Sequence, residues 1–180
     1  NLILSLLISK GVPMILMGDE IGRSQGGNNN SWCQNNLLGW MNWEHGQQDL
    51  ELLEYFKYVI KIRKKLINIF NPSSFLNKQT NENIPKYHWH GTKLDSPDWS
   101  SWSHTVAFSI NKGDTNPLLW IGFNAYSKSI DFRLPKCKYN WLKVIDTNML
   151  GIFEPLTINE KSVSIKSRSS LLIISEEVFG

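Results

Sequence analysis

The chain has 180 residues, of which 41% are hydrophobic and 19% are charged, so it is long enough for a sizeable core and its composition excludes a disordered chain. Its net charge of +3 comes from scattered basic residues, and the sequence shows no stripe of basic and aromatic side chains of the kind that binds nucleic acid. The first apolar run, residues 2–9, is too short to span a bilayer and lacks the basic flank of a signal peptide.

The start of the chain predicts a helix followed by a strand. Residues 2–9 are apolar and predict the end of a buried helix that is closed at Gly11. Residues 12–17 form an apolar run between Gly11 and Gly18, which predicts a buried parallel strand. The chain opens within this pattern, without an initiator Met or a helix-starting cap, which indicates a piece of a longer protein.

The loop that follows this strand contains the first candidate site. In α/β barrels the working loops follow the carboxyl ends of the strands. Asp19 and Glu20 resemble a glycosidase acid and nucleophile in type, but such a pair must face across the bond, and neighbours on an extended chain point to opposite sides. We expect one of them to line a pocket while backbone N–H groups hold the other. In the alternative, each carboxylate braces the loop and pairs with Arg23.

An amide-rich stretch around one tryptophan continues this loop. Amide groups offer donors and acceptors for sugar hydroxyls, and an indole face can stack on a pyranose ring. The alternative is a loop that bonds to itself through Asn turns, and the residue pattern favours neither. The stretch contains Asn28, Asn29, Asn30, Ser31, Trp32, Cys33, Gln34 and Asn35.

Residues 49–67 form the clearest predicted helix. Its apolar side chains recur at helical spacing, its first turn is acidic and its last turn is basic, as the helix dipole favours. Asp49 is the predicted N-cap. Residues 71–83 are polar and contain Pro72, so we predict a linker there, between a first unit of residues 1–70 and a second unit of residues 84–180.

Beyond this linker, short β-prone runs alternate with turn residues. Their spacing predicts an antiparallel β-sandwich. Cys33 and Cys137 match no zinc or redox spacing, which predicts free thiols in a reducing compartment. The predicted strands are residues 86–89, 104–110, 118–124, 129–134, 141–146, 162–165 and 169–174.

Two further groups of residues carry candidate chemistry in the β unit. His88 and His90 share a face of a predicted strand, as two metal ligands could, but no third ligand is evident, and half-exposed strand residues are the favoured interpretation. Trp99 and Trp102 lie in an acidic and aromatic loop, which forms a secondary glucan-binding surface or, as the favoured interpretation, a turn with Trp99 packed inward. We expect no metal and no cofactor.

Residues 11–36 closely resemble the last barrel strand and the following loop of isoamylases and bacterial glycogen-debranching enzymes, within the α-amylase superfamily. The elements GVP and GDE are shared widely in that superfamily, whereas the extension GRSQGGNNNSWCQNN is typical of the debranching branch. Downstream, the segments LGWMNW, WHG, PDWS and HTVAF are similar to the family's last barrel helix and to the start of its C-terminal β domain.

This resemblance implies a fold and an activity. The fold is an α+β chain, in which residues 1–70 form the last helix–strand–loop–helix of a (β/α)8 barrel and residues 84–180 form an antiparallel β-sandwich. The parent enzyme hydrolyses α-1,6 branch points of glycogen- or starch-type glucans, in the cytoplasm or, in a plant, the plastid stroma. Its partner is therefore a branched α-glucan.

The resemblance places no catalytic residue in this chain. The family's three catalytic carboxylates lie on earlier barrel strands, so we expect the chain alone to be inactive. Only loop residues are carried over, as candidate substrate contacts. They are Asp19, Glu20, Arg23, Asn28, Asn29, Asn30, Trp32 and Gln34.

Two other functions stay open at this point. The β unit is a glucan-binding module in its own right, or it is purely structural and covers the end of a barrel. In either case we expect no nucleic acid and no membrane as partner. An apolar strand at residues 12–17 without barrel neighbours favours pairing with a second copy of the chain, as a homodimer.

Overall fold

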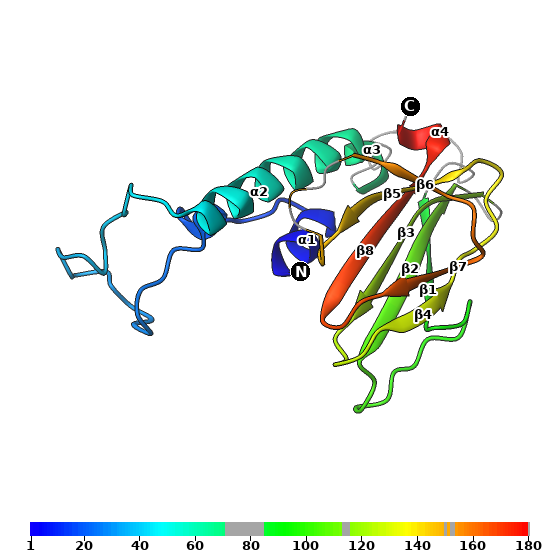
Figure 1. Cartoon of the computed structure of the whole chain (residues 1–180), viewed down its shortest axis with the longest axis horizontal. Helices are drawn as coiled ribbons and strands as arrows, with labels where there is room; N and C mark the ends of the chain where they lie inside the picture. The colour runs from blue at the N-terminus through cyan, green and yellow to red at the C-terminus, as the bar shows by residue number, and fades with distance from the viewer. Residues whose placement is uncertain (71–84, 113–115, 150, 152–153, 180) are drawn as a thin grey trace.

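The structure is a computed structural model that describes residues 1–70, 85–112, 116–149, 151 and 154–179. It consists of a helical part with a long loop and a β part against which the helices lie (Figure 1). The predicted linker, residues 71–83, lies outside the described residues, and the division of the chain into two units there stays a prediction. Of the helices that the structure describes, none is long and apolar enough to cross a membrane.

Antiparallel pairing organises the β part into two sheets. The larger sheet has six strands in the order β1-β2-β3-β8-β5-β6, and the smaller pairs β4 with β7. The predicted strands are confirmed as β1–β5, β7 and β8, whereas β6 is too short to stand out in the sequence. The strands are β1 (Pro85–His90), β2 (Thr105–Lys112), β3 (Asn116–Asn124), β4 (Ile130–Arg133), β5 (Trp141–Asp146), β6 (Leu156–Ile158), β7 (Ser162–Ile165) and β8 (Ser169–Ser175).

The central strand β3 is buried on both faces, and its alternating side chains enter two different cores. Trp120 lies between the two sheets with Phe132 of β4 and Ile165 of β7. Leu119 and Ile121 point the other way, into the core under the helices. An apolar run buried on both faces is the reason why this strand shows no polar alternation.

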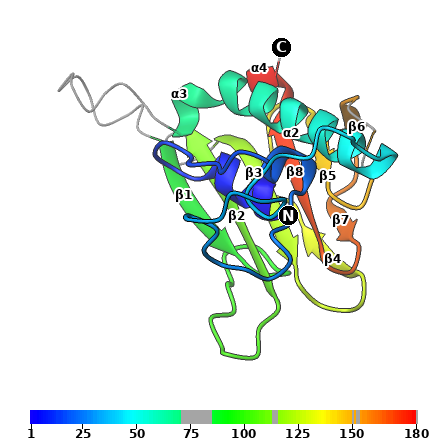
Figure 2. The same cartoon turned by 90° about the vertical axis from the view of Figure 1, so that its left-hand side faces the viewer.

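The helices cover the second face of the larger sheet. They are α1 (Leu2–Ile8), α2 (Gln47–Lys65) and the short α3 (Ile67–Phe70), and Figure 2 shows α1 and α2 lying across the sheet. Leu4 of α1 and Val59 of α2 share one core with Ile110, Ile121 and Leu172 of the sheet. A last short helix, α4 (Glu176–Phe179), follows β8.

The predicted helix at residues 49–67 is confirmed as α2, but its cap is not where we predicted it. The N-cap is Gly46, and the Asp49 carboxylate at the third helical position accepts a hydrogen bond from the Gly46 backbone N–H at 3.0 Å. Asp49 therefore stabilises the helix start by reaching back to it. The basic last turn contains Arg63, Lys64 and Lys65, as predicted.

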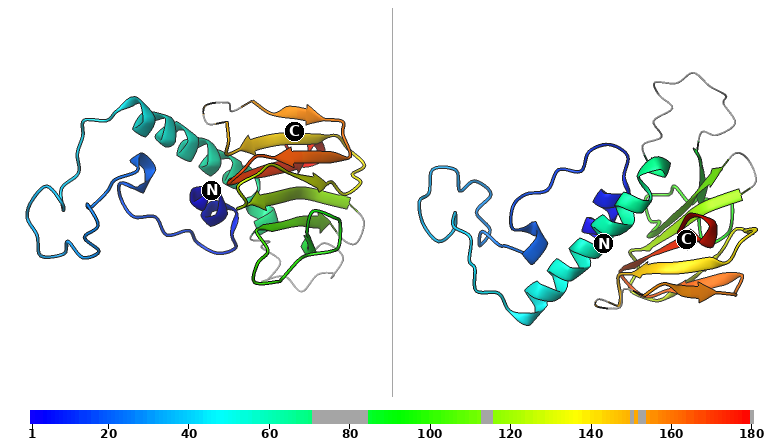
Figure 3. Two further views of the ribbon diagram at one scale, coloured as in Figure 1. Left: turned by 60° about the horizontal axis from the view of Figure 1, so that its bottom comes forward. Right: turned by 90° about the horizontal axis from the view of Figure 1, so that it is seen from above.

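Residues 12–17, predicted as a buried strand, are mostly exposed and pair with no strand in the part of the chain that the structure describes. Its backbone runs without helix or strand after α1, and Figure 3 shows it leading into a loop that projects away from the sheets. Val12 and Met14 are 96% and 90% exposed. A strand needs a neighbour to complete its hydrogen bonds, and no local feature of the sequence replaces one.

Candidate functional site

The base of the projecting loop is a short 3-10 helix, η1 (Asp19–Ile21), so the extended backbone that we predicted for the two carboxylates is wrong. The Asp19 carboxylate accepts a hydrogen bond from the Leu16 N–H at 3.2 Å. The Glu20 carboxylate accepts one from the Gly18 N–H at 2.8 Å. Both carboxylates therefore stabilise the turn that contains them. They accept hydrogen bonds from backbone N–H groups that have no partner in a helix or strand.

Arg23 connects the two ends of the loop through bonds to the backbone, in place of the ion pair with Asp19 or Glu20 that was one of the two alternatives. Its Nη2 atom donates to the carbonyl oxygens of Leu38 at 2.9 Å and Gly39 at 3.0 Å. Its stem packs so closely on Gly18 that an added Cβ there would lie 2.6 Å from Arg23 Cδ. Gly18, with a φ of 102°, is thus required both by its backbone conformation and by this contact.

Asp19 and Arg23 also line a cavity of about 580 Å³ between the loop base and the helices. Leu6 of α1, Ile15 and Phe56 of α2 form apolar parts of its wall. The predicted pocket position for one of the two carboxylates therefore falls on Asp19, although its carboxylate also accepts a backbone N–H. A mostly apolar cavity with a carboxylate and a guanidinium at its edge has the character of a small-molecule or packing site.

The amide-rich stretch bonds to itself through Asn turns, which was one of the two alternatives. The Asn28 side-chain oxygen accepts from the Asn30 N–H at 2.9 Å, and the Asn30 oxygen accepts from the Trp32 N–H at 3.2 Å. Gln34 Oε1 accepts from the Asn36 amide at 3.4 Å, and Asn29 is exposed. These bonds use side-chain oxygens and fix the course of the loop, so a role for the amides in sugar contact stays a proposal.

Trp32 is the most exposed tryptophan of the loop, at 93%. Its backbone N–H is held by Asn30, whereas its ring has solvent around it. The next tryptophan, Trp40, donates its indole N–H to the Asn35 side chain at 2.9 Å and is more covered. The Trp32 ring is thus open to solvent, and its contact with sugar stays a proposal.

The second candidate surface lies on the β part, and the predicted inward packing of Trp99 is wrong. Trp99 is 66% exposed and Trp102 is 76% exposed. Trp99 instead lies edge-on against Trp89 of β1, with ring centroids 5.4 Å apart and an interplanar angle of 71°. The Trp99 ring therefore packs on the exposed side of β1 and is not buried in the turn.

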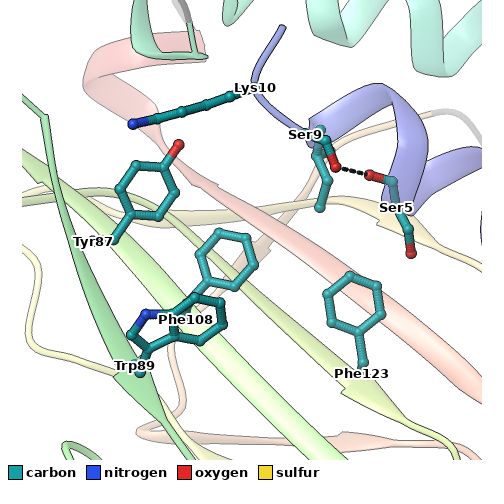
Figure 4. A pocket seen from close by; sticks show the side chains of 8 residues that line it. Ser5, Ser9, Lys10, Tyr87, Trp89, Phe108 and Phe123 are labelled. Atoms are coloured by element: carbon teal, nitrogen blue, oxygen red, sulfur yellow. Dashed lines mark hydrogen bonds between the residues drawn. The ribbon is translucent and has the colours of Figure 1, made fainter. Parts of the chain in front are cut away.

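Four aromatic residues of β1, β2 and β3 were not among the site residues predicted from the sequence. Trp89 packs on Phe108 of β2 with centroids 5.2 Å apart, and Tyr87 packs on Phe108 at 5.8 Å (Figure 4). Phe123 of β3 lies beside them. The signal was present in the spacing of Tyr87 and Trp89, which share one face of a strand, but which face lies open depends on the helices.

His88 and His90 do not form a metal pair in this structure, and the expected half-exposure is wrong for His90, which is buried. The His90 Nδ1 atom accepts from the Asp95 N–H at 2.9 Å, and its Nε2 atom contacts the Ser109 hydroxyl at 3.1 Å. The Ser109 hydroxyl donates to the Asn111 side chain at 3.0 Å. No group of three or more His, Cys, Asp and Glu residues suited to a metal occurs among the described residues.

His90 makes the stability of the β part depend on pH. Burial lowers the pKa of His90, the Asp95 carboxylate opposes this shift, and His88 adds to it. The unfolded chain therefore takes up the proton at a higher pH than the folded chain does. The contribution of His90 to the free energy of unfolding is therefore complete above about pH 6.5, the pKa of an unperturbed histidine. It is lost as the pH falls from there through the folded pKa.

We expect His90→Gln to flatten this dependence. Urea unfolding between pH 7.5 and 5.5 measures it, and the substitution should remove part of the loss in stability that the unchanged chain shows. The matched control is His45→Gln, because His45 lies in the loop before α2, outside the β part. An equal pH dependence in both variants would contradict the role of His90.

Comparison with known proteins matches the β part to one family. Residues 88–175 match the model for the C-terminal domain of isoamylases 1–3. The resemblance seen in the sequence is thereby confirmed.

Relatives of this domain extend the likeness over most of the chain. The rice (Oryza sativa subsp. japonica) protein "Isoamylase 1, chloroplastic" is 33% identical over 158 residues, which are 87% of this chain and 19% of the rice protein. The "Glycogen debranching enzyme" of Erwinia tasmaniensis is 32% identical over 143 residues, 77% of this chain and 20% of that enzyme. The chain therefore spans about a fifth of the length of these relatives.

Solved structures support the same fold. The pullulanase type I of Bacillus subtilis, complexed with maltose, superposes with a TM-score of 0.70 at 20% identity, over 96% of this chain and 22% of the pullulanase chain. The alpha-amylase from H. orenii superposes with a TM-score of 0.53 at 17% identity, over 97% of this chain and 34% of the amylase. At these identities the likeness concerns the fold alone, an antiparallel β domain with helices against it.

Proposed function

We propose that this chain is part of a debranching glycoside hydrolase that cleaves α-1,6 branch points of glycogen- or starch-type glucans. The observation that carries the proposal is the isoamylase C-terminal domain at residues 88–175. Relatives named isoamylase and glycogen debranching enzyme, similar across both the helical and the β part, support it. The partner of the whole enzyme is then a branched α-glucan.

The helical part fits the end of a (β/α)8 barrel, and we propose this origin for residues 1–70. The order α1, extended segment, loop and α2 is the order of such a unit. Residues 12–17 are apolar and pair with no strand among the described residues, as a barrel strand would without the other strands of its sheet. A linker at residues 71–83 and a β domain at residues 84–180 complete the proposed division. Pairing of two chains through the exposed segment stays a prediction.

In this proposal the chain does no hydrolysis by itself. Glycoside hydrolysis needs two carboxyl groups facing each other across the glycosidic bond. Asp19 and Glu20 are instead each bonded to a backbone N–H of their own turn. The loop residues of the first candidate site, from Asp19 to Gln34, would flank the bound sugar. The compartment is the cytoplasm or, for a plant-like parent, the plastid stroma; the named rice relative is chloroplastic.

The test is hydrolysis of amylopectin by two proteins. The purified 180-residue chain should release no reducing ends above the rate without enzyme, and a longer protein that joins this chain to its barrel should release linear chains. Trp32→Ala in the longer protein should raise KM for amylopectin more than it lowers kcat, because the ring would contact sugar away from the bond.

The matched control is Trp43→Ala, since Trp43 is 78% exposed but lies outside the loop's amide-rich stretch. Hydrolysis of amylopectin by the 180-residue chain that is abolished by Asp19→Asn would contradict the proposal that this chain does no hydrolysis by itself. A longer protein that leaves α-1,6 branches intact would overturn the proposed activity itself.

A further inference from the structure

An aromatic surface remains open on the β part, beside the helices. We call it the aromatic groove and define it by Tyr87, Trp89, Trp99, Phe108 and Phe123. Two cavities of about 400 Å³ and about 360 Å³ adjoin at Phe123, which lies in the walls of both. Figure 4 shows Tyr87, Trp89, Phe108 and Phe123 lining the first cavity together with α1.

The rings of the aromatic groove are held in place while they stay in contact with water. Trp89 is 45% exposed and contacts both Phe108 and Trp99, so its ring is wedged between two others. Trp102 follows in the same loop as Trp99 and is more exposed still. Indoles fixed in the folded state lose little conformational freedom when a ligand covers them, which favours binding.

Polar groups border these rings on both sides. At one end stand Ser5, Ser9 and Lys10, with the Lys10 ammonium 4.7 Å from the centre of the Tyr87 ring. At the other end stand Asp98 and His104. Hydroxyl, ammonium, carboxylate and imidazole groups around aromatic rings make the groove amphipathic, unlike the uniformly apolar core of a protein–protein contact.

Asp98 is an acceptor that stays ionised near neutral pH. The Ser100 side chain and the Ser100 backbone N–H, which lies 3.0 Å from the carboxylate, lower the pKa of Asp98 by hydrogen bonding. His104 stacks on Tyr126 with ring centroids 5.6 Å apart and planes 14° from parallel, which fixes the orientation of its ring. Both groups can therefore exchange hydrogen bonds with hydroxyls without first being ordered.

A pyranose chain has the matching chemistry, since each sugar ring presents C–H groups on its faces and hydroxyls around its rim. We propose that the aromatic groove, with Trp102 beside it, binds a segment of α-glucan at a site that performs no hydrolysis. The sugar faces would lie on Trp89 and Trp99, and the hydroxyls would reach Asp98 and His104. The identity of the sugar rests on the proposed debranching function.

Electrophoresis of the 180-residue chain in gels with and without glycogen tests this proposal. The unchanged chain should be retarded in proportion to the glycogen concentration. Trp99→Ala should weaken the apparent binding on the order of tenfold, which corresponds to about 1.4 kcal/mol, and Trp102→Ala should weaken it less. The matched control Trp43→Ala, in an exposed loop of the helical part, should migrate like the unchanged chain.

Urea unfolding of each variant separates loss of sugar contact from loss of folding. The proposal is overturned if glycogen does not retard the unchanged chain, if Trp99→Ala and Trp43→Ala behave alike, or if retardation also occurs without glycogen through self-association. Hydrolysis by the longer protein is a separate readout, on a short branched oligosaccharide that cannot reach the groove. If the chain binds glycogen but the longer protein does not hydrolyse the oligosaccharide, only the debranching proposal is contradicted. If the longer protein hydrolyses the oligosaccharide but the chain does not bind glycogen, only the proposed glucan site in the aromatic groove is contradicted.

Discussion

Replacing Arg63 with methionine is expected to lower the free energy of unfolding by about 3 kcal/mol. Arg63 is only 8% exposed, although it lies in the basic last turn of α2. Its Nη1 atom donates to the carbonyl oxygens of Leu7 and, at 2.9 Å, of Ser9, and its Nη2 atom donates to that of Gly11 at 2.6 Å. The Leu7 and Ser9 carbonyls lie at the end of α1, where helical partners are lacking, and Gly11 follows just beyond it, so Arg63 caps one helix from another.

Methionine keeps the apolar stem of this side chain but leaves the carbonyl oxygens without their donor. Urea unfolding measures the effect, and proteolysis near Gly11 should become faster because α1 is no longer tied to α2. The matched control is Lys64→Met, on the exposed face of the same turn, which should change stability by no more than about 0.5 kcal/mol. Equal losses for the two substitutions would show that Arg63 acts only through its charge near the helix end.

Trp120→Ala should be the most destabilising substitution in the β part, at about 4 kcal/mol. Trp120 is fully buried on β3, and its ring packs edge-on against Phe132 with centroids 5.9 Å apart. The same ring lies against Gly122, where an added Cβ would come within 2.5 Å of it. Truncation therefore opens a cavity between the two sheets that their paired backbones cannot collapse to fill.

Trp102→Ala is the matched control for this substitution. It removes the same side chain from an exposed loop, where Trp102 is 76% exposed, so stability should stay within about 0.5 kcal/mol of the unchanged chain. Thermal unfolding followed by near-ultraviolet circular dichroism measures both variants. A loss below about 1 kcal/mol for Trp120→Ala would mean that the two sheets do not share a packed core.

The strands were predictable because their signal is local. β5 and β7 begin and end at the predicted residues, since turn residues border each of them. β6 was missed because three mostly exposed residues have no alternation to detect. For α2 the helical spacing identified the helix, but the position of its cap depended on a side chain that reaches backwards. An Asp at the N-cap and an Asp at the third helical position look alike in the sequence.

The candidate sites were likewise predictable only in part from the sequence. The amide-rich loop was identified from its residues, but that the side-chain oxygens of Asn28 and Asn30 accept hydrogen bonds from the backbone of the same loop needed the structure. The aromatic groove could not be predicted, because its rings come from β1, β2, β3 and a loop that are separated along the chain. Burial of His90 likewise follows from the neighbouring strand, where Ser109 completes its hydrogen bonds.

By itself, the sequence determined the resemblance to isoamylases, the antiparallel β domain and the long helix, because family motifs, strand alternation and helical spacing are all properties of short segments. Only the tertiary structure decided which rings stay open to solvent, that Arg63 is buried against the end of α1, and that residues 12–17 form no strand. Each of these depends on what lies beside the segment in space. Burial and hydrogen bonding are properties of neighbours, and distant parts of the chain supply those neighbours only once it has folded.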